Sequence, residues 1–182
     1  MNTKINKSVI FTGYACNVRC SFCIDLNKRQ INASSKEILT NILRAKQNWT
    51  DYLEIIWGEI TIRRDFFVML AFAKKVWFKT IMFVTNWLKF ADLEFSKKVV
   101  ELGIIDHIVF SIHGHTAEIH DGLVASKGAF DKLFRWIANL RSLGFNKIGI
   151  NHTIVQQNYE YLPEFVDLLN IHKLWNVEVI FA

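Results

Sequence analysis

Short apolar runs alternate with amphipathic segments along the chain, and this alternation restricts the fold more than any other feature of the sequence. Six runs rich in β-branched and aromatic residues are predicted strands, at 8–12, 52–57, 80–85, 105–112, 147–155 and 177–181. Five segments with apolar residues at helical spacing lie between them, at 35–47, 66–76, 92–102, 129–143 and 161–169. Strands that alternate with helices form parallel βαβ units with right-handed crossovers. The sequence therefore predicts an α/β fold, built either as an open doubly wound sheet or as a full or partial barrel.

Residues with known positional preferences mark several predicted helix ends. Ser34 and Asp65 stand where helices begin and are typical N-caps. Gly103 and Gly144 stand where helices end and are typical C-caps. Residues 113–127, between the fourth strand and the next helix, are predicted to form a polar loop.

Length and composition exclude some classes of protein. A chain of 182 residues is long enough for one domain with a real core. Its hydrophobic content is 51%, but no apolar run reaches the roughly 18 residues that a membrane span needs. The apolar run near the N-terminus is too short for a signal peptide, so we expect a cytoplasmic protein with reduced cysteines. The net charge of +5 comes from scattered lysines and gives no specific nucleic-acid signal.

All three cysteines lie within eight residues. Cys16, Cys20 and Cys23 follow the first predicted strand with the spacing C-x3-C-x2-C. An odd count at such tight spacing argues against a disulfide framework and indicates one shared metal group. Two groups are open at this point: a [4Fe–4S] cluster, which with three cysteines keeps one iron free for another ligand, and zinc with a histidine as fourth ligand. A chance cluster of buried cysteines is the third alternative.

These motifs resemble those of the radical S-adenosylmethionine (SAM) superfamily. The spacing C-x3-C-x-aromatic-C after a short N-terminal strand is its signature, with Phe22 in the aromatic position. Trp57-Gly58-Glu59-Ile60 is similar to the family's Gly-Gly-Glu-Pro, with Trp57 and Ile60 departing from it, and Thr85-Asn86-Trp87 is similar to Thr-Asn-Gly. The family fold is a partial (β/α)6 barrel, and six strands match it. The resemblance therefore implies one radical SAM core domain over residues 1–182.

The resemblance also implies a set of site residues at the C-terminal ends of the strands, where parallel barrels carry their chemistry. It assigns the metal to Cys16, Cys20 and Cys23, the adenine of SAM to Phe22, and the methionyl amine to the segment around Gly58 and Glu59. The full set of cofactor-binding candidates is Phe22, Trp57, Gly58, Glu59, Asn86, Ser111, His113 and Asn151.

The activity implied by the resemblance is radical chemistry. A reduced [4Fe–4S] cluster cleaves SAM, and the resulting 5′-deoxyadenosyl radical abstracts hydrogen from an unidentified substrate, either a small molecule or a peptide. An electron donor such as flavodoxin or ferredoxin is the implied partner. The alternative function is a non-catalytic iron–sulfur or zinc module. Because strand six is followed by Ala182 alone, we expect a chain that lacks a C-terminal segment of the family fold.

Three histidines form a second candidate motif. His113, His115 and His120 have the spacing H-x-H-x4-H within the predicted loop. Two interpretations remain: a metal site, or solvent-exposed loop histidines.

The six tryptophans stand where glycine is expected. They are Trp49, Trp57, Trp77, Trp87, Trp136 and Trp175. Glycine itself is scarce, at 8 residues or about 4% against the usual ~7%. Either these codons are UGA, read as glycine in the source organism, or six real tryptophans pack a hydrophobic barrel. In both cases we expect Trp57 and Trp87 to lie near the cysteine loop, where an indole would crowd the SAM pocket.

Overall fold

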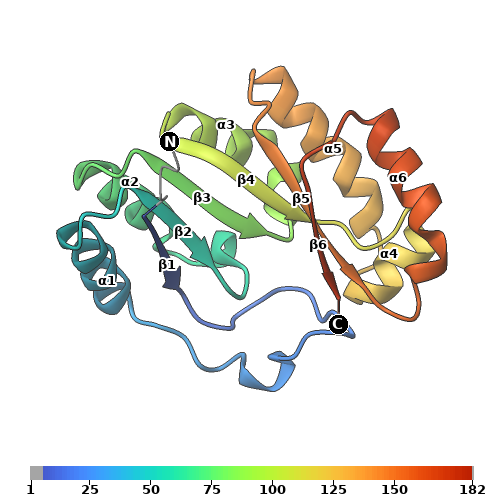
Figure 1. Ribbon diagram of the computed structural model, residues 1–182, viewed down its shortest axis with the longest axis horizontal. Helices are drawn as coiled ribbons and strands as arrows, with labels where there is room; N and C mark the ends of the chain where they lie inside the picture. The colour runs from blue at the N-terminus through green and yellow to red at the C-terminus, as the bar shows by residue number, and fades with distance from the viewer. Residues whose placement is uncertain (1–5, 182) are drawn as a thin grey trace.

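The protein is a curled half-barrel of six parallel strands, seen in a computed structural model that describes residues 6–181 (Figure 1). The strands lie in sequential order from β1 to β6, and every neighbouring pair is parallel. Their bounds are β1 Lys7–Phe11, β2 Tyr52–Ile56, β3 Thr80–Thr85, β4 Ile105–Ser111, β5 Ile148–Ile154 and β6 Val177–Phe181. The prediction of a partial barrel with six strands is therefore confirmed.

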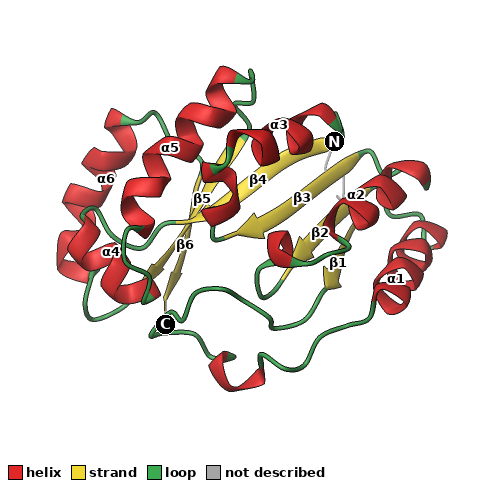
Figure 2. Ribbon diagram, turned by 180° about the vertical axis from the view of Figure 1, so that it is seen from behind, coloured by secondary structure: helices red, strands yellow, loops and turns green. Residues whose placement is uncertain are grey.

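Helices cover one face of this sheet (Figure 2). Their bounds are α1 Ser35–Gln47, α2 Phe66–Lys75, α3 Leu93–Glu101, α4 Ala117–Val124, α5 Ala129–Ser142 and α6 Leu162–Ile171. The described residues also form four short 3₁₀ helices, labelled η: η1 Leu26–Lys28, η2 Ile60–Ile62, η3 Leu88–Ala91 and η4 Tyr159–Tyr161. None of the helices that the structure describes is long and apolar enough to cross a membrane.

The core lies between the sheet and these helices. Leu53 of β2 and Phe83 of β3 are fully buried, and Phe110 of β4 stacks on Trp136 of α5 with ring centroids 3.8 Å apart. The central strands are buried on both faces, as expected for a parallel sheet. The edge strands are more exposed: β6 has no buried residue and β1 has one.

Most predicted helix ends are confirmed. Ser34 caps α1 through a reciprocal capping box with Glu37. Gly103 and Gly144 follow α3 and α5 with φ of 63° and 75°, a left-handed conformation that glycine adopts without steric cost. Asp65 is wrong as a capping side chain, because its carboxylate accepts hydrogen bonds from Arg63 and Ser35 instead of the helix backbone.

The predicted polar loop at 113–127 is also wrong, since it contains α4. Thr116 caps this helix by accepting a hydrogen bond from the backbone N–H of Ile119. The buried side chains of His120, Leu123 and Val124 hold it in place. Eight residues with mixed polarity give too short a periodic signal for the sequence to reveal them. Residues 6–181 therefore contain six α-helices where five were predicted.

We expect Asp121→Ala to lower the free energy of unfolding by about 1–2 kcal/mol. The N-cap residue of α5, Gly128, has no capping side chain. Asp121 reaches across from α4 and accepts hydrogen bonds from the backbone N–H of Gly128 and of Phe130. Urea denaturation measures the loss, and Asp167→Ala, which removes an exposed carboxylate of α6, is the matched control. An equal loss in the two variants would contradict this capping role.

Candidate active site

The three cysteines lie on a long loop between β1 and α1 that runs along the C-terminal ends of the strands (Figure 1). At its start, the Ala15 carbonyl accepts a hydrogen bond from the backbone N–H of Glu59, at 2.7 Å. Further along the loop, on the opposite side of the half-barrel, the backbone N–H groups of Arg19 and Ser21 donate to carbonyls of α4. The loop is therefore fixed at both sides of the half-barrel.

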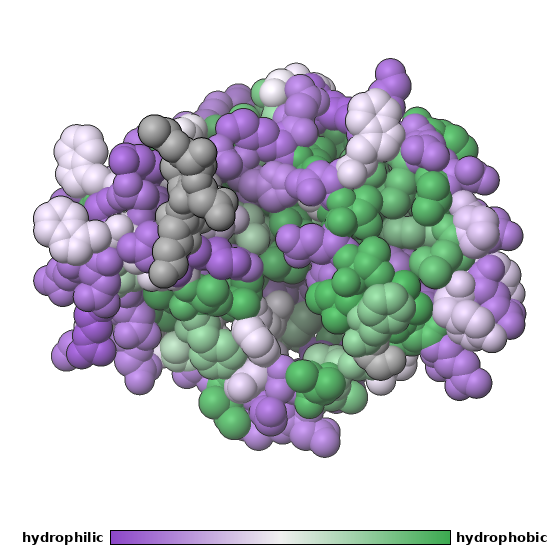
Figure 3. Space-filling model, in the orientation of Figure 1, coloured by the Kyte–Doolittle hydropathy of each residue, from purple (hydrophilic) through white to green (hydrophobic). Residues whose placement is uncertain are grey.

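A cavity of about 630 Å³ lies between this loop and the strand ends, a size typical of small-molecule sites. Figure 3 shows a hollow on this face, with hydrophobic side chains gathered around it. Its wall includes all three cysteines and one or more residues from the C-terminal end of each of β2 to β6. Of the predicted site residues, the cavity is lined by Cys16, Cys20, Cys23, Phe22, Trp57, Gly58, Asn86, Ser111, His113 and Asn151.

Glu59 is the predicted site residue that lies outside this lining. Its side chain is buried, and its carboxylate accepts four hydrogen bonds from the protein. The backbone N–H and hydroxyl of Thr61 donate to Oε1 at 2.9 and 2.5 Å, and the hydroxyl of Thr85 donates to the same oxygen at 2.8 Å. The backbone N–H of Asn86 donates to Oε2 at 2.5 Å. Glu59 therefore joins the turn after β2 to the end of β3.

Burial raises the pKa of the Glu59 carboxyl, and its hydrogen bonds oppose this shift. Three of these donors converge on Oε1 and one reaches Oε2, and the side chain is buried outside the cavity lining. The arrangement gives Glu59 a positioning role, since it sets the turns that face the cysteines.

Asn86 connects the end of β3 with the cysteine loop. Its Nδ2 donates to Oδ1 of Asn17 at 2.7 Å and lies 3.7 Å from Sγ of Cys16. An amide donor beside a thiolate sulfur fixes the orientation of a ligating cysteine.

Phe22 and His113 pack against each other in the cavity wall, edge to face, with ring centroids 4.7 Å apart. Nδ1 of His113 accepts a hydrogen bond from the backbone N–H of Thr153 at 3.1 Å. Burial lowers the pKa of His113 well below its ordinary value, so the ring is neutral and carries its proton on Nε2. His113 thus offers the cavity an uncharged donor.

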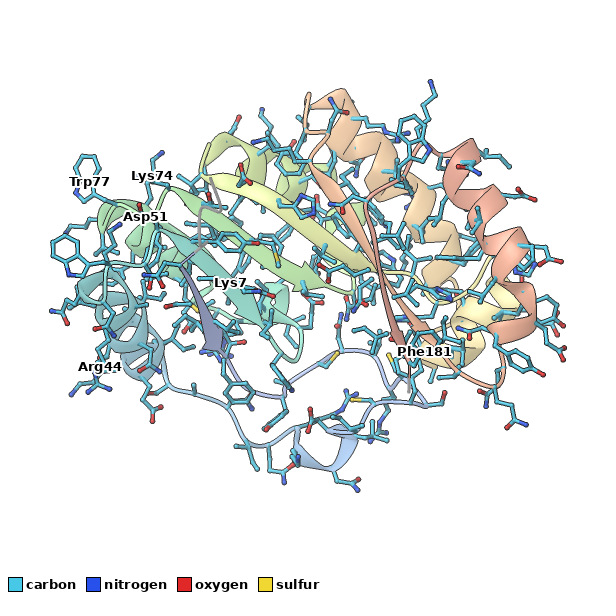
Figure 4. All side chains as sticks on the ribbon, viewed as in Figure 1. Lys7, Arg44, Asp51, Lys74, Trp77 and Phe181 are labelled. Atoms are coloured by element: carbon cyan, nitrogen blue, oxygen red, sulfur yellow. The ribbon has the colours of Figure 1, made fainter. Side chains whose placement is uncertain are left out.

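Several residues in the cavity wall were not indicated by any sequence pattern. Arg29 donates from Nη1 to the carbonyl of Cys16 at 2.7 Å, while its buried Nε has no partner. The side-chain oxygen of Asn151 is likewise buried without a partner. Glu178 and Phe181 of β6 complete the wall, and Figure 4 shows Phe181 at the end of its strand, beside the loop. Asn151 was among the predicted site residues, but a signal for Arg29, Glu178 and Phe181 was missing because these three reach the site through tertiary contacts alone.

The donor set fits an iron–sulfur cluster. The three cysteines are free and half-buried. Burial, with a smaller contribution from the neighbouring Cys16 and Cys23, raises the pKa of the Cys20 thiol to about 12. Thiolates crowded in this way need a cationic group to hold them. Arg29 Nε and Asn151 Oδ1 are one buried donor and one buried acceptor without a hydrogen-bond partner, in two residues of the cavity wall.

No group of three or more histidine, cysteine or acidic side chains in residues 6–181 is arranged to hold a single metal ion. Each thiolate of a [4Fe–4S] cluster binds a different iron, so its ligands are not gathered around one ion. His113 and His120 of the H-x-H-x4-H motif are buried, with ring centroids 6.2 Å apart, and each Nδ1 accepts a backbone N–H. The interpretation of these two as exposed loop histidines is wrong, because His120 lies on the buried face of α4 and His113 is buried beside it.

Comparison with known families agrees with this geometry. Residues 10–169 match the profile described as "Radical SAM superfamily". The chain belongs to the radical SAM superfamily. Its curated relatives include an Fe-coproporphyrin III synthase of Methanosarcina barkeri, 32% identical over 64% of this chain and 28% of that protein. A probable GTP 3′,8-cyclase of Saccharolobus islandicus is 24% identical over 91% of this chain and 54% of that protein. This radical SAM chain thus spans about half the length of these relatives, or less.

Solved structures share the fold. SuiB of Streptococcus suis, in complex with the precursor peptide SuiA, superimposes with a TM-score of 0.76 and 22% identity, over 96% of this chain and 39% of that one. The protein anSMEcpe, with bound AdoMet and the peptide Cp18Cys, gives a TM-score of 0.76 and 14% identity, over 96% of this chain and 50% of that one.

We expect Glu59→Ala to lower the free energy of unfolding by about 3 kcal/mol, because it leaves buried donors without an acceptor. Chemical denaturation measures the loss. Glu101→Ala is the control, since Glu101 is exposed and pairs with Lys97 at 3.9 Å, a contact expected to contribute less than about 0.5 kcal/mol. Similar losses in both variants would contradict the joining role of Glu59.

We expect the stability of the protein to fall as the pH decreases from about 6.5 to about 4. Burial lowers the pKa of His120 to about 4, while nearby Asp121 opposes this shift. In the unfolded chain the same imidazole titrates near 6.5. Between these values the unfolded state binds a proton that the folded state does not, which costs about 1.4 kcal/mol per pH unit.

The variant His120→Asn isolates this effect. Its Oδ1 replaces Nδ1 as acceptor for the backbone N–H of His113, but it does not titrate. Denaturation at several pH values between 4 and 7 should give a slope smaller by about one proton than that of the unmodified chain. An unchanged slope would show that His120 is protonated in the folded state.

Proposed function

We propose that this chain is the core of a radical SAM enzyme, which binds a [4Fe–4S] cluster through Cys16, Cys20 and Cys23 and SAM in the adjoining cavity. The observation that carries the proposal is the convergence of three free thiols and the ends of β2 to β6 on one cavity. Family membership supports it, and so does the bound AdoMet in the structural relative anSMEcpe.

A [4Fe–4S] cluster held by Cys16, Cys20 and Cys23, with SAM beside it, would supply the redox chemistry, namely one-electron cleavage of SAM and hydrogen abstraction from a substrate. The chain's own residues would hold the cluster and SAM and shield them from water. Asn86 orients Cys16 through its amide. Phe22 presents an aromatic edge to the cavity beside His113, whose neutral ring donates from Nε2.

Two unpartnered polar atoms in the wall suit the amino-acid part of SAM. The Arg29 guanidinium carries a positive charge beside the Cys16 carbonyl and keeps Nε free, which matches a carboxylate. Asn151 Oδ1 is a free acceptor on the β5 side of the cavity, which matches a hydroxyl or an ammonium group. Ser111 is paired with Asn151 in the sheet register and adds a hydroxyl next to it.

The substrate class is a separate prediction. The names of the relatives point to a porphyrin, a nucleotide and peptides. Two structural relatives are complexes with peptides, which supports a peptide substrate. A low-potential electron donor such as flavodoxin or ferredoxin is the proposed partner.

Anaerobic reconstitution with iron and sulfide tests the core reaction. We expect the visible absorption of an iron–sulfur cluster and, after reduction, conversion of SAM into 5′-deoxyadenosine, measured by chromatography. Cys20→Ala should lose the cluster and the product together, whereas Ser21→Ala, a substitution at an exposed neighbour, should keep both.

Reconstitution should be repeated with Trp57→Gly/Trp87→Gly, because both indoles line the cavity. Bound zinc without SAM cleavage in both versions would overturn the proposed enzyme in favour of a non-catalytic module.

A further inference from the structure

Four tryptophans adopt a backbone conformation that belongs to glycine. A positive φ in the left-handed region brings Cβ too close to the following carbonyl oxygen, so glycine is the residue that usually takes it. Five of the eight glycines do so here. Among the other described residues, two have positive φ, Ala125 and Lys173, apart from the tryptophans. The tryptophans are Trp49 (φ 60°), Trp57 (φ 79°), Trp77 (φ 67°) and Trp87 (φ 60°).

Trp49 and Trp77 occupy the glycine position of a Schellman motif. In this motif the first left-handed residue after a helix donates its N–H to the carbonyl three residues back, and the next residue donates five residues back. Trp49 donates to Lys46, and Thr50 donates to Ala45. The same pattern at the end of α2 joins Trp77 to Lys74 and Phe78 to Ala73.

A glycine performs this function elsewhere in the same chain. After α5, Gly144 donates to Arg141 and Phe145 donates to Leu140. Packing does not explain tryptophan at the two other helix ends, because the side chains of Trp49 and Trp77 are 87% and 81% exposed. Figure 4 shows Trp77 projecting away from the protein.

Trp57 begins a pair of left-handed residues at the end of β2. Gly58 follows with φ of 59°, and a Cβ on it would lie 2.4 Å from the carbonyl oxygen of Ala15. Two consecutive residues with positive φ are typical of Gly-Gly or Asn-Gly turns. The indole of Trp57 stands in the cavity wall and donates to Asp25 at 2.7 Å.

Trp87 is the left-handed residue in the turn after β3. Its indole is buried beside His120, with ring centroids 4.9 Å apart, and also lines the cavity. Its Nε1 reaches the carbonyl of Ala129 at 3.4 Å, near the limit for a hydrogen bond.

We propose that the natural protein carries glycine at positions 49, 57, 77 and 87, encoded by UGA codons that its source organism reads as glycine. Trp136 and Trp175 are outside the proposal, because neither has a positive φ. Trp136 lies inside α5, stacked on Phe110. The proposal is independent of the activity of the chain. Only the expected effect of Trp57→Gly and Trp87→Gly on SAM binding rests on the proposed function.

The gene and the natural protein test it directly. We expect UGA at all four codons; UGG at any of them overturns the proposal for that position. Mass spectrometry of the protein isolated from its source organism then identifies the residue. Peptides with glycine at these positions support the proposal, and peptides with tryptophan overturn it.

Thermal unfolding of the 182-residue chain provides a second test. Trp49→Gly and Trp77→Gly remove exposed indoles and the strained φ, so each should raise the melting temperature by about 2–4 °C. Trp175→Gly is the matched control, since Trp175 is 72% exposed and has no positive φ. We expect no rise for the control. A fall in all three variants alike would overturn the backbone argument.

SAM binding to the anaerobically reconstituted chain, measured by equilibrium dialysis, tests the consequence for the cavity. Trp57→Gly/Trp87→Gly should bind SAM at least about tenfold more tightly than the chain with all six tryptophans. Trp49→Gly/Trp77→Gly, with both changes away from the cavity, should bind SAM as that chain does. Cluster absorption verifies that each variant folds. Equal affinity in all versions overturns the steric argument. Absence of SAM binding from every version overturns the proposed function, while the codons and masses still decide the glycine proposal.

Discussion

The buried carboxylate of Glu59 is the interaction on which the arrangement of the site depends. It gathers donors from the turn after β2 and from the end of β3, while the backbone N–H of the same residue is bonded to Ala15 in the cysteine loop. A carboxyl group without partners would be strongly disfavoured at this depth. Its hydrogen bonds offset that cost, and they hold three segments from distant parts of the sequence in one geometry.

The cysteine loop spans the open edge of the half-barrel because both of its sides are attached. Near β1, the side-chain oxygen of Asn32 accepts the backbone N–H of Ala15, and Gly13 packs so closely on Asn32 that a Cβ there would lie 2.4 Å from its oxygen. On the other side the loop is bonded to Leu123 and Val124 at the end of α4. The thiols are thus held over the strand ends, with the cavity between them.

Local pattern was sufficient to predict much of the fold. The six strands and five of the six helices follow from periodicity and β-branched content, because each depends on residues adjacent in the sequence. Helix α4 was not predicted, because its stability comes from burying His120 and Leu123 against other elements. Asp65 was misread for a related reason: its side chain pairs with Arg63, a contact that an N-cap preference does not include.

The site shows the same division. The cysteine spacing by itself brought three thiols together, because three residues within one short loop need no tertiary information to meet. The alternation of strands and helices likewise determined a parallel sheet whose strand ends converge. Tertiary structure alone decided that the Glu59 carboxylate is bonded to Thr61, Thr85 and Asn86, that Arg29 and Phe181 join the cavity wall, and that four tryptophans have left-handed backbone conformations. Burial, hydrogen-bond pairing and φ are set by residues far apart in the chain, so no local pattern contains them.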